Sequence, residues 1–176
     1  MSHAPPRGPV HQRIPPGDDR PRMVCDDCGF IHYDNPKIVV GAVCSWRGRV
    51  LLCRRAIEPR RGFWTLPAGY MELHETVADG ARREAREEAG VAIALDGLLA
   101  IYDIPRISQV QVIFRARLPG PALDPGPETL EAGLFAWADI PWDRLAFPSV
   151  RWALEHWRQA GRRRLAAPFG NPVEGL

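Results

Sequence analysis

The chain has 176 residues, of which 45% are hydrophobic and 25% charged, and its formal net charge is +2 at pH 7. These proportions are typical of a soluble globular domain, and so small a net charge does not indicate nucleic acid or an anionic membrane as a partner. No apolar run approaches the roughly 18 residues of a membrane-spanning helix, and the N-terminus lacks the apolar core of a secretory signal. We therefore expect a cytoplasmic protein that binds neither membrane nor nucleic acid.

The N-terminal segment 1–22 is rich in Pro, Gly and Arg, and a segment that can bury so little favours a loose or disordered arm. Cys25 and Cys28 follow it as one Cys-x2-Cys pair. Cys44 and Cys53 fall in predicted strands and are expected to be core residues. The four cysteines show no disulfide framework of a secreted domain.

The next part of the chain predicts a hairpin and a long loop. "KIVVGAVCSW" (37–46) is a β-branched apolar run, and "VLLCRR" (50–55) is its predicted partner across the turn at 47–49. The polar loop 56–75 is punctuated by Gly and Pro. It contains three aromatic residues that suit either packing or contact with a ligand: Phe63, Trp64 and Tyr70.

A helix is predicted over residues 76–89, with Gly90 at the position where a left-handed residue ends a helix. One face of this helix consists mostly of alanine, so it can lie very close to a neighbouring element. The remaining elements are predicted as strands at 92–104, 109–118 and 132–137, a loop at 119–128, and an amphipathic helix at 148–160. Strands that surround isolated helices predict an α/β fold with helices packed on a mixed sheet.

The helix carries three glutamates at spacings that bring carboxylates together. Glu84 lies three residues before Glu87 and four before Glu88, and like charges so placed repel by a few tenths of a kcal/mol per pair. Arg83 can pair with Glu87, which leaves Glu84 and Glu88 as neighbours without a compensating charge. A solvated helix face is the ordinary explanation of such a charge run. A divalent cation would resolve the repulsion, since Mg²⁺ is commonly held by one or two carboxylates together with substrate phosphates.

The wider spacing favours the cation. The chain carries the pattern G-x5-E-x7-R-E-U-x-E-E-x-G-U, in which U is apolar, through Gly69, Glu75, Arg83, Glu84, Glu87, Glu88 and Gly90. This pattern resembles the Nudix box, complete over residues 69–91. The resemblance implies a loop–helix–loop that holds Mg²⁺ or Mn²⁺ against a diphosphate.

The resemblance also implies a role for each residue of the box. Glu84, Glu87 and Glu88 would supply metal oxygens, the Gly69 carbonyl would add another, and Arg83 would orient Glu87. Glu75 would fix the loop or assist a second metal ion. In the reaction, water would attack one phosphorus atom of a substituted nucleoside diphosphate. Metal ions lower the pKa of a bound water, and a nearby carboxylate can take its proton.

The likeness extends to "VCDDCGFIHYDNPKIVVGAV", "GFWTLPAGYMELHET" and "DIPWDRLAFPSVRWAL". These segments are similar to the Nudix subgroup of the plant chloroplast FAD and ADP-ribose pyrophosphatase and its bacterial relatives. The subgroup implies the Nudix α/β/α sandwich, a mixed sheet between helices, and its members are often dimers, which allows a homodimer here. We expect a Pro-rich arm with a zinc-ribbon remnant at 1–36, a hydrolase domain at 37–165 and a tail at 166–176.

Zinc is not expected, because structural zinc requires four ligands. The relatives carry two Cys-x2-Cys knuckles, and this chain has only one of them. The spacing of His3, His11 and His32 fits no knuckle.

Substrate contacts are predicted around the box. Arg54 and Arg55, with Arg60 and Arg61 nearby, are suited to hold a diphosphate. Trp64 and Tyr102 are candidates to stack on a nucleotide ring, whereas Phe114 is a better candidate for core packing. Glu128 and Glu131 precede a strand where Nudix enzymes recruit a further acid, and Glu131 is favoured as the base.

The leading hypothesis is a metal-dependent hydrolase that converts a nucleoside diphosphate derivative, FAD or ADP-ribose, into two monophosphates. One alternative is a housekeeping pyrophosphohydrolase of nucleoside triphosphates, which would release free pyrophosphate. Another is a ligand-sensing Nudix module, which the complete set of glutamates argues against.

Overall fold

The computed structural model describes residues 8–161, 163 and 166–173. The chain divides into two compact units, Met1–Pro36 and Lys37–Leu176. The first contains a three-stranded sheet and the second a seven-stranded sheet. In the described part of the chain, no helix is long and apolar enough to cross a membrane.

The sheet of the N-terminal unit is antiparallel and consists of β1 (His11–Arg13), β2 (Arg22–Val24) and β3 (Ile31–His32). The expectation of a loose arm is therefore wrong for the described part of residues 1–22. Pairing of β1 with β2 satisfies their backbone groups and orders the segment with little apolar burial. Cys25 and Cys28 lie in the turn between β2 and β3, where the Cys25 N–H donates to the Phe30 carbonyl at 2.9 Å.

The sheet of the C-terminal unit is mixed, and its main path runs β10-β5-β4-β9-β8. At its centre, β4 (Lys37–Trp46) pairs in parallel with β9 (Gln109–Arg117) and antiparallel with β5 (Arg49–Arg55). The outer strands β8 (Ala94–Ile104) and β10 (Thr129–Phe135) pair antiparallel with β9 and β5. Two short strands inside the predicted loop 56–75, β6 (Trp64–Thr65) and β7 (Ala68–Tyr70), pair with β5 and β4.

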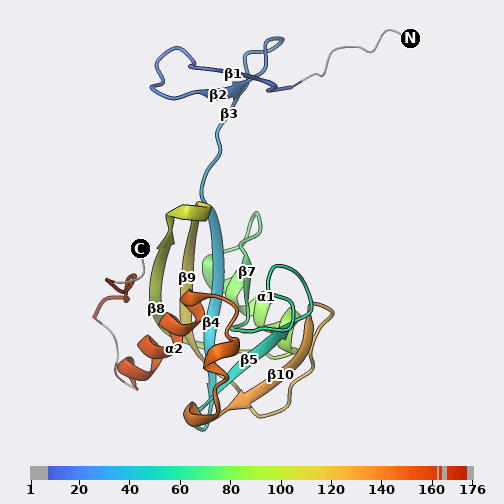
Figure 1. The fold of residues 1–176 in the computed structure, drawn as a ribbon, viewed down its shortest axis with the longest axis vertical. Coiled ribbons are helices and arrows are strands. Elements are labelled where there is room, and N and C mark those ends of the chain that lie inside the picture. Colours follow the sequence, from blue (N-terminus) through green and yellow to red (C-terminus); the bar gives the residue numbers. More distant parts are fainter. Residues whose placement is uncertain (1–7, 162, 164–165, 174–176) are drawn as a thin grey trace. The chain divides into compact units, whose positions relative to one another are not determined.

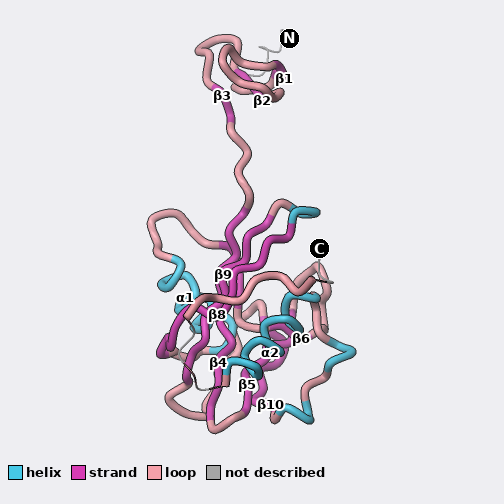
Figure 2. The backbone as a smooth tube through the Cα atoms, turned by 90° about the vertical axis from the view of Figure 1, so that its left-hand side faces the viewer, coloured by secondary structure: helices cyan, strands magenta, loops and turns pink. Residues whose placement is uncertain are grey.

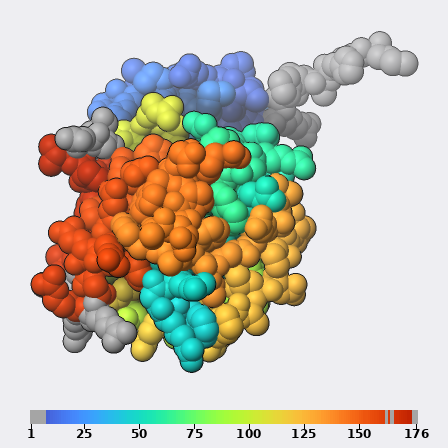
Figure 3. Space-filling view, turned by 60° about the horizontal axis from the view of Figure 1, so that its bottom comes forward, coloured from blue at the N-terminus to red at the C-terminus, as the bar shows by residue number. Residues whose placement is uncertain are grey.

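Helices cover both faces of this sheet. Figures 1 and 2 show α1 (Val77–Ala89) and α2 (Pro148–Ala160) on opposite sides of the strands. Three 3-10 turns connect the elements: η1 (Pro105–Ile107), η2 (Trp137–Asp139) and η3 (Trp142–Arg144). In the space-filling view, the orange and red residues that follow β10 form a continuous surface (Figure 3). The predicted α/β/α sandwich with a mixed sheet is confirmed.

The alternation of side chains along β4 produces two hydrophobic cores. Ala42 and Cys44 belong to the cluster that also contains Ala85 and Ala89 of α1, whereas Val43 belongs to the cluster of α2. This division follows from the period of two along a strand, which sends successive side chains to opposite faces. Cys44 and Cys53 are both buried, as expected for core cysteines.

Helix α1 begins and ends where its capping residues allow. The Thr76 hydroxyl accepts a hydrogen bond from the Asp79 N–H at 3.1 Å, and Gly90 adopts the left-handed conformation with φ of 66°. The helix lies close to β4, because a Cβ at Gly80 would come within 2.7 Å of the Val40 side chain. The buried side also includes Glu84 and Glu88.

The β10 strand begins three residues earlier than predicted, because Thr129 already pairs with Arg55 of β5. The segment after α2 returns to the outer strand β8. There the Phe169 N–H donates to the Leu99 carbonyl and the Ile101 N–H donates to the Phe169 carbonyl, both at 2.9 Å. These two bonds cover part of a sheet edge that would otherwise be free to pair.

Candidate active site

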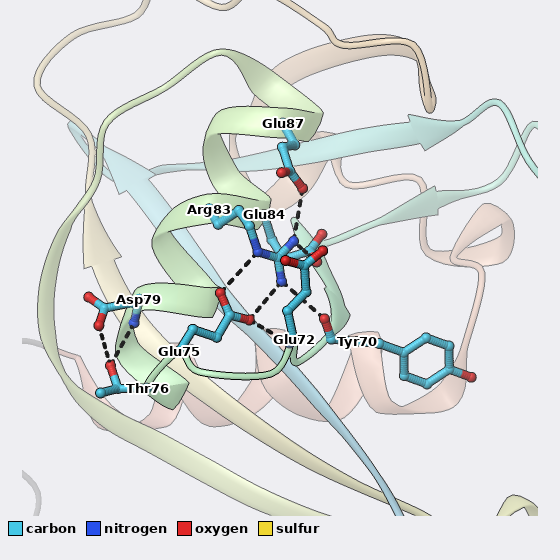
Figure 4. A network of polar contacts seen from close by, with 8 residues as sticks. All are labelled: Tyr70, Glu72, Glu75, Thr76, Asp79, Arg83, Glu84 and Glu87. Atoms are coloured by element: carbon cyan, nitrogen blue, oxygen red, sulfur yellow. Dashed lines mark hydrogen bonds and ion pairs between the residues drawn. The ribbon is translucent and has the colours of Figure 1, made fainter.

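Arg83 is the centre of a hydrogen-bond network between α1 and the loop before it (Figure 4). Its Nε and Nη2 donate to the two oxygens of Glu75 at 3.0 and 2.9 Å. Its Nη1 donates to Glu84 at 2.7 Å and to Glu87 at 2.9 Å. Nη2 also donates to the Tyr70 carbonyl at 3.0 Å. Arg83 therefore fastens the loop to the helix.

The hydrogen bonds from Arg83 lower the pKa of Glu75, and the same contacts raise the pKa of Arg83 itself. Sequence reasoning paired Arg83 with Glu87 alone and left Glu84 uncompensated, which is wrong. Glu84 directly follows Arg83 in the sequence, whereas Glu87 lies four residues after it. The guanidinium nevertheless reaches both carboxylates, because it presents several donors in a fork.

Among the three glutamates, Glu88 is the one that forms no ion pair with a residue of the described chain. Its side chain is buried, and its Oε2 accepts one hydrogen bond, from the Ala68 N–H at 3.2 Å. Burial, with the nearby charge of Glu84, raises the pKa of Glu88 to about 8. Burial also raises the pKa of Glu84, in spite of its contact with Arg83. Two adjoining acids are thus held where their charged forms are costly, which is common at functional sites.

Gly69 of β7 lies directly against Glu84. A Cβ at this position would collide with the Glu84 carboxylate, with its Cδ and Oε2 both at 2.6 Å. Pairing of Gly69 with Val40 of β4 holds the backbone at this place. A residue with a side chain would displace the carboxylate, so the close approach accounts for the glycine.

The donor set fits a hard divalent cation. Carboxylate and carbonyl oxygens are the ligands that Mg²⁺ and Mn²⁺ prefer, and a cation would relieve the cost of ionising the buried Glu88. Within the described residues, however, no three His, Cys, Asp or Glu side chains are gathered around one point that could hold a metal ion. The Glu84 and Glu87 carboxylates instead accept hydrogen bonds from the Arg83 guanidinium.

The predicted acids after the loop lie in different surroundings. Glu131 is in β10 and pairs with Arg54, with 3.1 Å between Arg54 Nη2 and Glu131 Oε2. Burial is the largest cause of the raised pKa values of Glu84 and Glu88, and the charge of Glu128 adds a smaller rise to both. Of the two acids, Glu128 is the one whose charge acts on these carboxylates.

The predicted substrate-contact residues also lie in different surroundings. The positive charge of Arg55 opposes the rise in the pKa of Glu88, so Arg55 lies near the carboxylates. Arg54 has a buried Nε without a hydrogen-bond partner in the described structure. Trp64 is half-buried in β6 and packs edge-on against Phe135 with 4.9 Å between ring centroids. Phe114 is half-buried against the α1 core, as expected for packing.

Tyr102 is not available to stack on a ligand ring. It is completely buried under α2, and its hydroxyl forms a 2.8 Å hydrogen bond with His156 Nδ1. Trp152 packs against it edge-on with 5.5 Å between ring centroids. The aromatic pattern of β8 could not distinguish a platform from a core residue, because the helix that covers Tyr102 is 50 residues away in the sequence.

Lys37 and Gln109 were not among the predicted site residues. Both lie beside the exposed ring of Tyr70, which the sequence indicated as suited either to packing or to contact with a ligand. The one available signal was that Lys37 is the only lysine of the chain. Two hollows of the described structure are lined by residues of 92–98, 115–119 and 166–168, and none of these carboxylates lines either hollow.

Two family models match the chain. One is described as the NUDIX domain and matches residues 35–156, and the other is described as Nudix N-terminal, a zinc ribbon, and matches residues 8–34. The chain is 30% identical over 119 residues to the ADP-ribose pyrophosphatase of Methanocaldococcus jannaschii, which covers 65% of this chain and 69% of that protein. It spans about half or less of the length of several other curated relatives.

Two solved structures are also similar to the chain. A NUDIX hydrolase from Nitrosomonas europaea superposes with a TM-score of 0.85 at 45% identity, over 92% of each chain. An ADP-ribose pyrophosphatase from Streptococcus suis superposes with a TM-score of 0.64 at 26% identity, over 78% of this chain and 100% of that one.

The zinc-ribbon match concerns the unit that was expected to lack zinc. Besides the two cysteines, the described part of this unit contains His11 and His32, which contact Asp26 at 3.3 Å and Asp34 at 3.2 Å. His3 lies outside the described residues. The match to a zinc-ribbon family does not support the expectation that zinc is absent, so the zinc content of the purified protein has to be measured.

Proposed function

The chain belongs to the Nudix family, and on this basis we propose that it is a metal-dependent hydrolase of a nucleoside diphosphate derivative, with ADP-ribose or FAD as the favoured substrate and two monophosphates as products. The observation that carries the proposal is the buried Glu88, which lies beside Glu84 and forms no ion pair with a described residue. Two neighbouring buried carboxylates destabilise a helix that has only a structural role, whereas a bound cation would stabilise them.

The proposed chemistry assigns a role to each residue around α1. Glu84, Glu87 and Glu88, with the Gly69 carbonyl, would hold Mg²⁺ or Mn²⁺. When bound, the metal would neutralise charge on the phosphoryl oxygens and acidify a water molecule. Arg83 would keep the carboxylates in place through its bonds to the loop, and Glu75 would anchor Arg83.

Two further contacts complete the proposal. Glu128 is preferred to Glu131 as the group that accepts the proton of the attacking water, because its charge acts on Glu84 and Glu88 while Glu131 pairs with Arg54. Arg55 would contact the diphosphate, and the unpartnered Nε of Arg54 offers another donor. Guanidinium groups suit this role because they donate two parallel hydrogen bonds to phosphate oxygens.

The substrate class rests on similarity. Relatives named as ADP-ribose pyrophosphatases occur among both the curated proteins and the solved structures, and the subgroup resemblance adds FAD. We also propose that the protein is a cytoplasmic homodimer that acts on a small nucleotide.

Product analysis tests the proposal. Purified protein with Mg²⁺ or Mn²⁺ should convert ADP-ribose to AMP and ribose 5-phosphate, or FAD to AMP and FMN, as resolved by chromatography. The Glu88→Gln variant is the matched control and should form neither product. Release of pyrophosphate from nucleoside triphosphates as the only activity would instead support a housekeeping hydrolase. Tight binding of ADP-ribose without any turnover would support a sensing module.

A further inference from the structure

The side chains of β7 alternate between the two faces of the sheet, so neighbouring residues face different surroundings. Gly69 faces α1 and the Glu84 carboxylate. Tyr70, the next residue, pairs with Val39 of β4, and Val39 pairs with Gln111 of β9. Figure 4 shows that the Tyr70 ring points away from the carboxylates, while its carbonyl accepts a hydrogen bond from Arg83. The ring is therefore rigidly attached to the network but lies outside it.

A polar group surrounds the Tyr70 ring. Gln109 Nε2 donates to the Tyr70 hydroxyl at 3.1 Å, and Gln111 Nε2 donates to Gln109 Oε1 at 3.4 Å. Lys37 Nζ lies 5.2 Å from the centroid of the ring. Lys37 pairs with Gln109 across β4 and β9, so the four side chains share one face of the sheet.

Two members of this group are exposed, and the two glutamines, Gln109 and Gln111, are half-buried. Tyr70 is 52% exposed, and Lys37 is also exposed, with no ion pair to a carboxylate in the described part of the chain. Tyr102 continues the row on the same face, next to Gln111, but α2 covers it completely.

The chemistry of the group matches a nucleotide. An exposed aromatic ring stacks on a planar heterocycle, and side-chain amides form hydrogen bonds with the edge of a base because they carry both donors and acceptors. A single uncompensated ammonium group attracts a phosphate. We infer that Tyr70, Lys37, Gln109 and Gln111 form a subsite for the purine nucleotide arm of the substrate, with the base on Tyr70, its edge at the glutamine amides and its phosphate near Lys37. This inference rests on the proposed function for the identity of the substrate.

The subsite makes a specific kinetic prediction. Tyr70→Leu keeps a side chain that suits β7 but removes the ring, so KM for ADP-ribose should rise about tenfold, which is the expected loss of one stacking contact, while kcat changes less than threefold. Tyr33→Leu is a matched control, because Tyr33 is 53% exposed and has Arg22 at 5.1 Å from its ring centroid. The control should leave both constants unchanged. An unchanged KM in Tyr70→Leu, or an equal rise in the control, would overturn the inference.

Binding of products separates this inference from the proposed function. In calorimetry with AMP as the probe, Tyr70→Leu and Lys37→Gln should each weaken binding about tenfold or more, whereas ribose 5-phosphate binding should not respond to Tyr70→Leu. Gln109→Ala should reduce the preference for AMP over IMP, because the two bases differ at the edge that the amides contact. Loss of turnover with retained Tyr70-dependent AMP binding would contradict the proposed reaction but support the subsite. AMP binding that is indifferent to all three changes would refute the subsite even in an active enzyme.

Discussion

The cost of the buried Glu88 can be measured directly with Glu88→Gln. The substitution preserves size and shape, and the glutamine oxygen can still accept the hydrogen bond from the Ala68 N–H. It removes the ability of the side chain to ionise and introduces an amide NH2 group. In metal-free protein at neutral pH or above, we expect the variant to be more stable than the wild type, because the carboxylate is buried without a cation.

The magnitude follows from the pKa. Burial raises the pKa of Glu88 from 4.5 to about 8, so the folded protein binds a proton that the unfolded chain releases. The wild type therefore loses free energy of unfolding as pH rises from 4.5 to 8, by about 3 kcal/mol at pH 7 and about 5 kcal/mol above pH 8. An amide hydrogen left without a partner in the variant offsets about 1 kcal/mol of the gain. We expect a net difference of about 2 kcal/mol at pH 7, or roughly 4–8 °C in Tm.

The assay is thermal unfolding between pH 5 and 8.5, with and without Mg²⁺, after removal of metal. The advantage of Glu88→Gln should grow with pH, and it should shrink or reverse in Mg²⁺, because a ligand that binds only the native state stabilises it. Glu87→Gln is the matched control, since its side chain is 57% exposed and pairs with Arg83; it should show the pH dependence of the wild type. If Glu88→Gln and the wild type lose stability in parallel from pH 5 to 8, burial does not penalise this carboxylate and the reasoning fails.

Four further outcomes are expected. Excess chelator should abolish hydrolysis and added Mg²⁺ or Mn²⁺ should restore it; full turnover in chelator would contradict the metal assignment. Gly69→Ala should lower kcat at least a hundredfold, because the new Cβ displaces the Glu84 carboxylate, and a near-normal rate would show that the contact is unimportant. Tyr102→Phe should lower the free energy of unfolding by about 1 kcal/mol through the lost hydrogen bond to His156, and it should not raise KM. A raised KM would show that Tyr102 contacts the substrate. Elemental analysis should find well under one zinc per chain, and stoichiometric zinc that is lost in Cys25→Ser would refute this expectation.

Much of the fold could be predicted from local patterns. The β-branched run 37–46, the capped helix before Gly90 and the amphipathic helix 148–160 each carry their own signal, because hydrophobic period and capping chemistry act within a few residues. The spacing of the box from Gly69 to Gly90 likewise lies within one loop and one helix. The short strands β6 and β7 could not be predicted, since their partners in β5 and β4 supply the pairing.

The sequence by itself determined that three glutamates lie together, because residues at helical spacing share one side of α1. Only the tertiary structure decided what surrounds them. Packing of α1 against β4 and β7 buries Glu88, which turns a repulsion of a few tenths of a kcal/mol into a cost of several kcal/mol. The same packing brings Glu84 against Gly69, while α2 covers Tyr102 and leaves Tyr70 exposed. Burial depends on elements that are distant in the chain, and no local spacing encodes it.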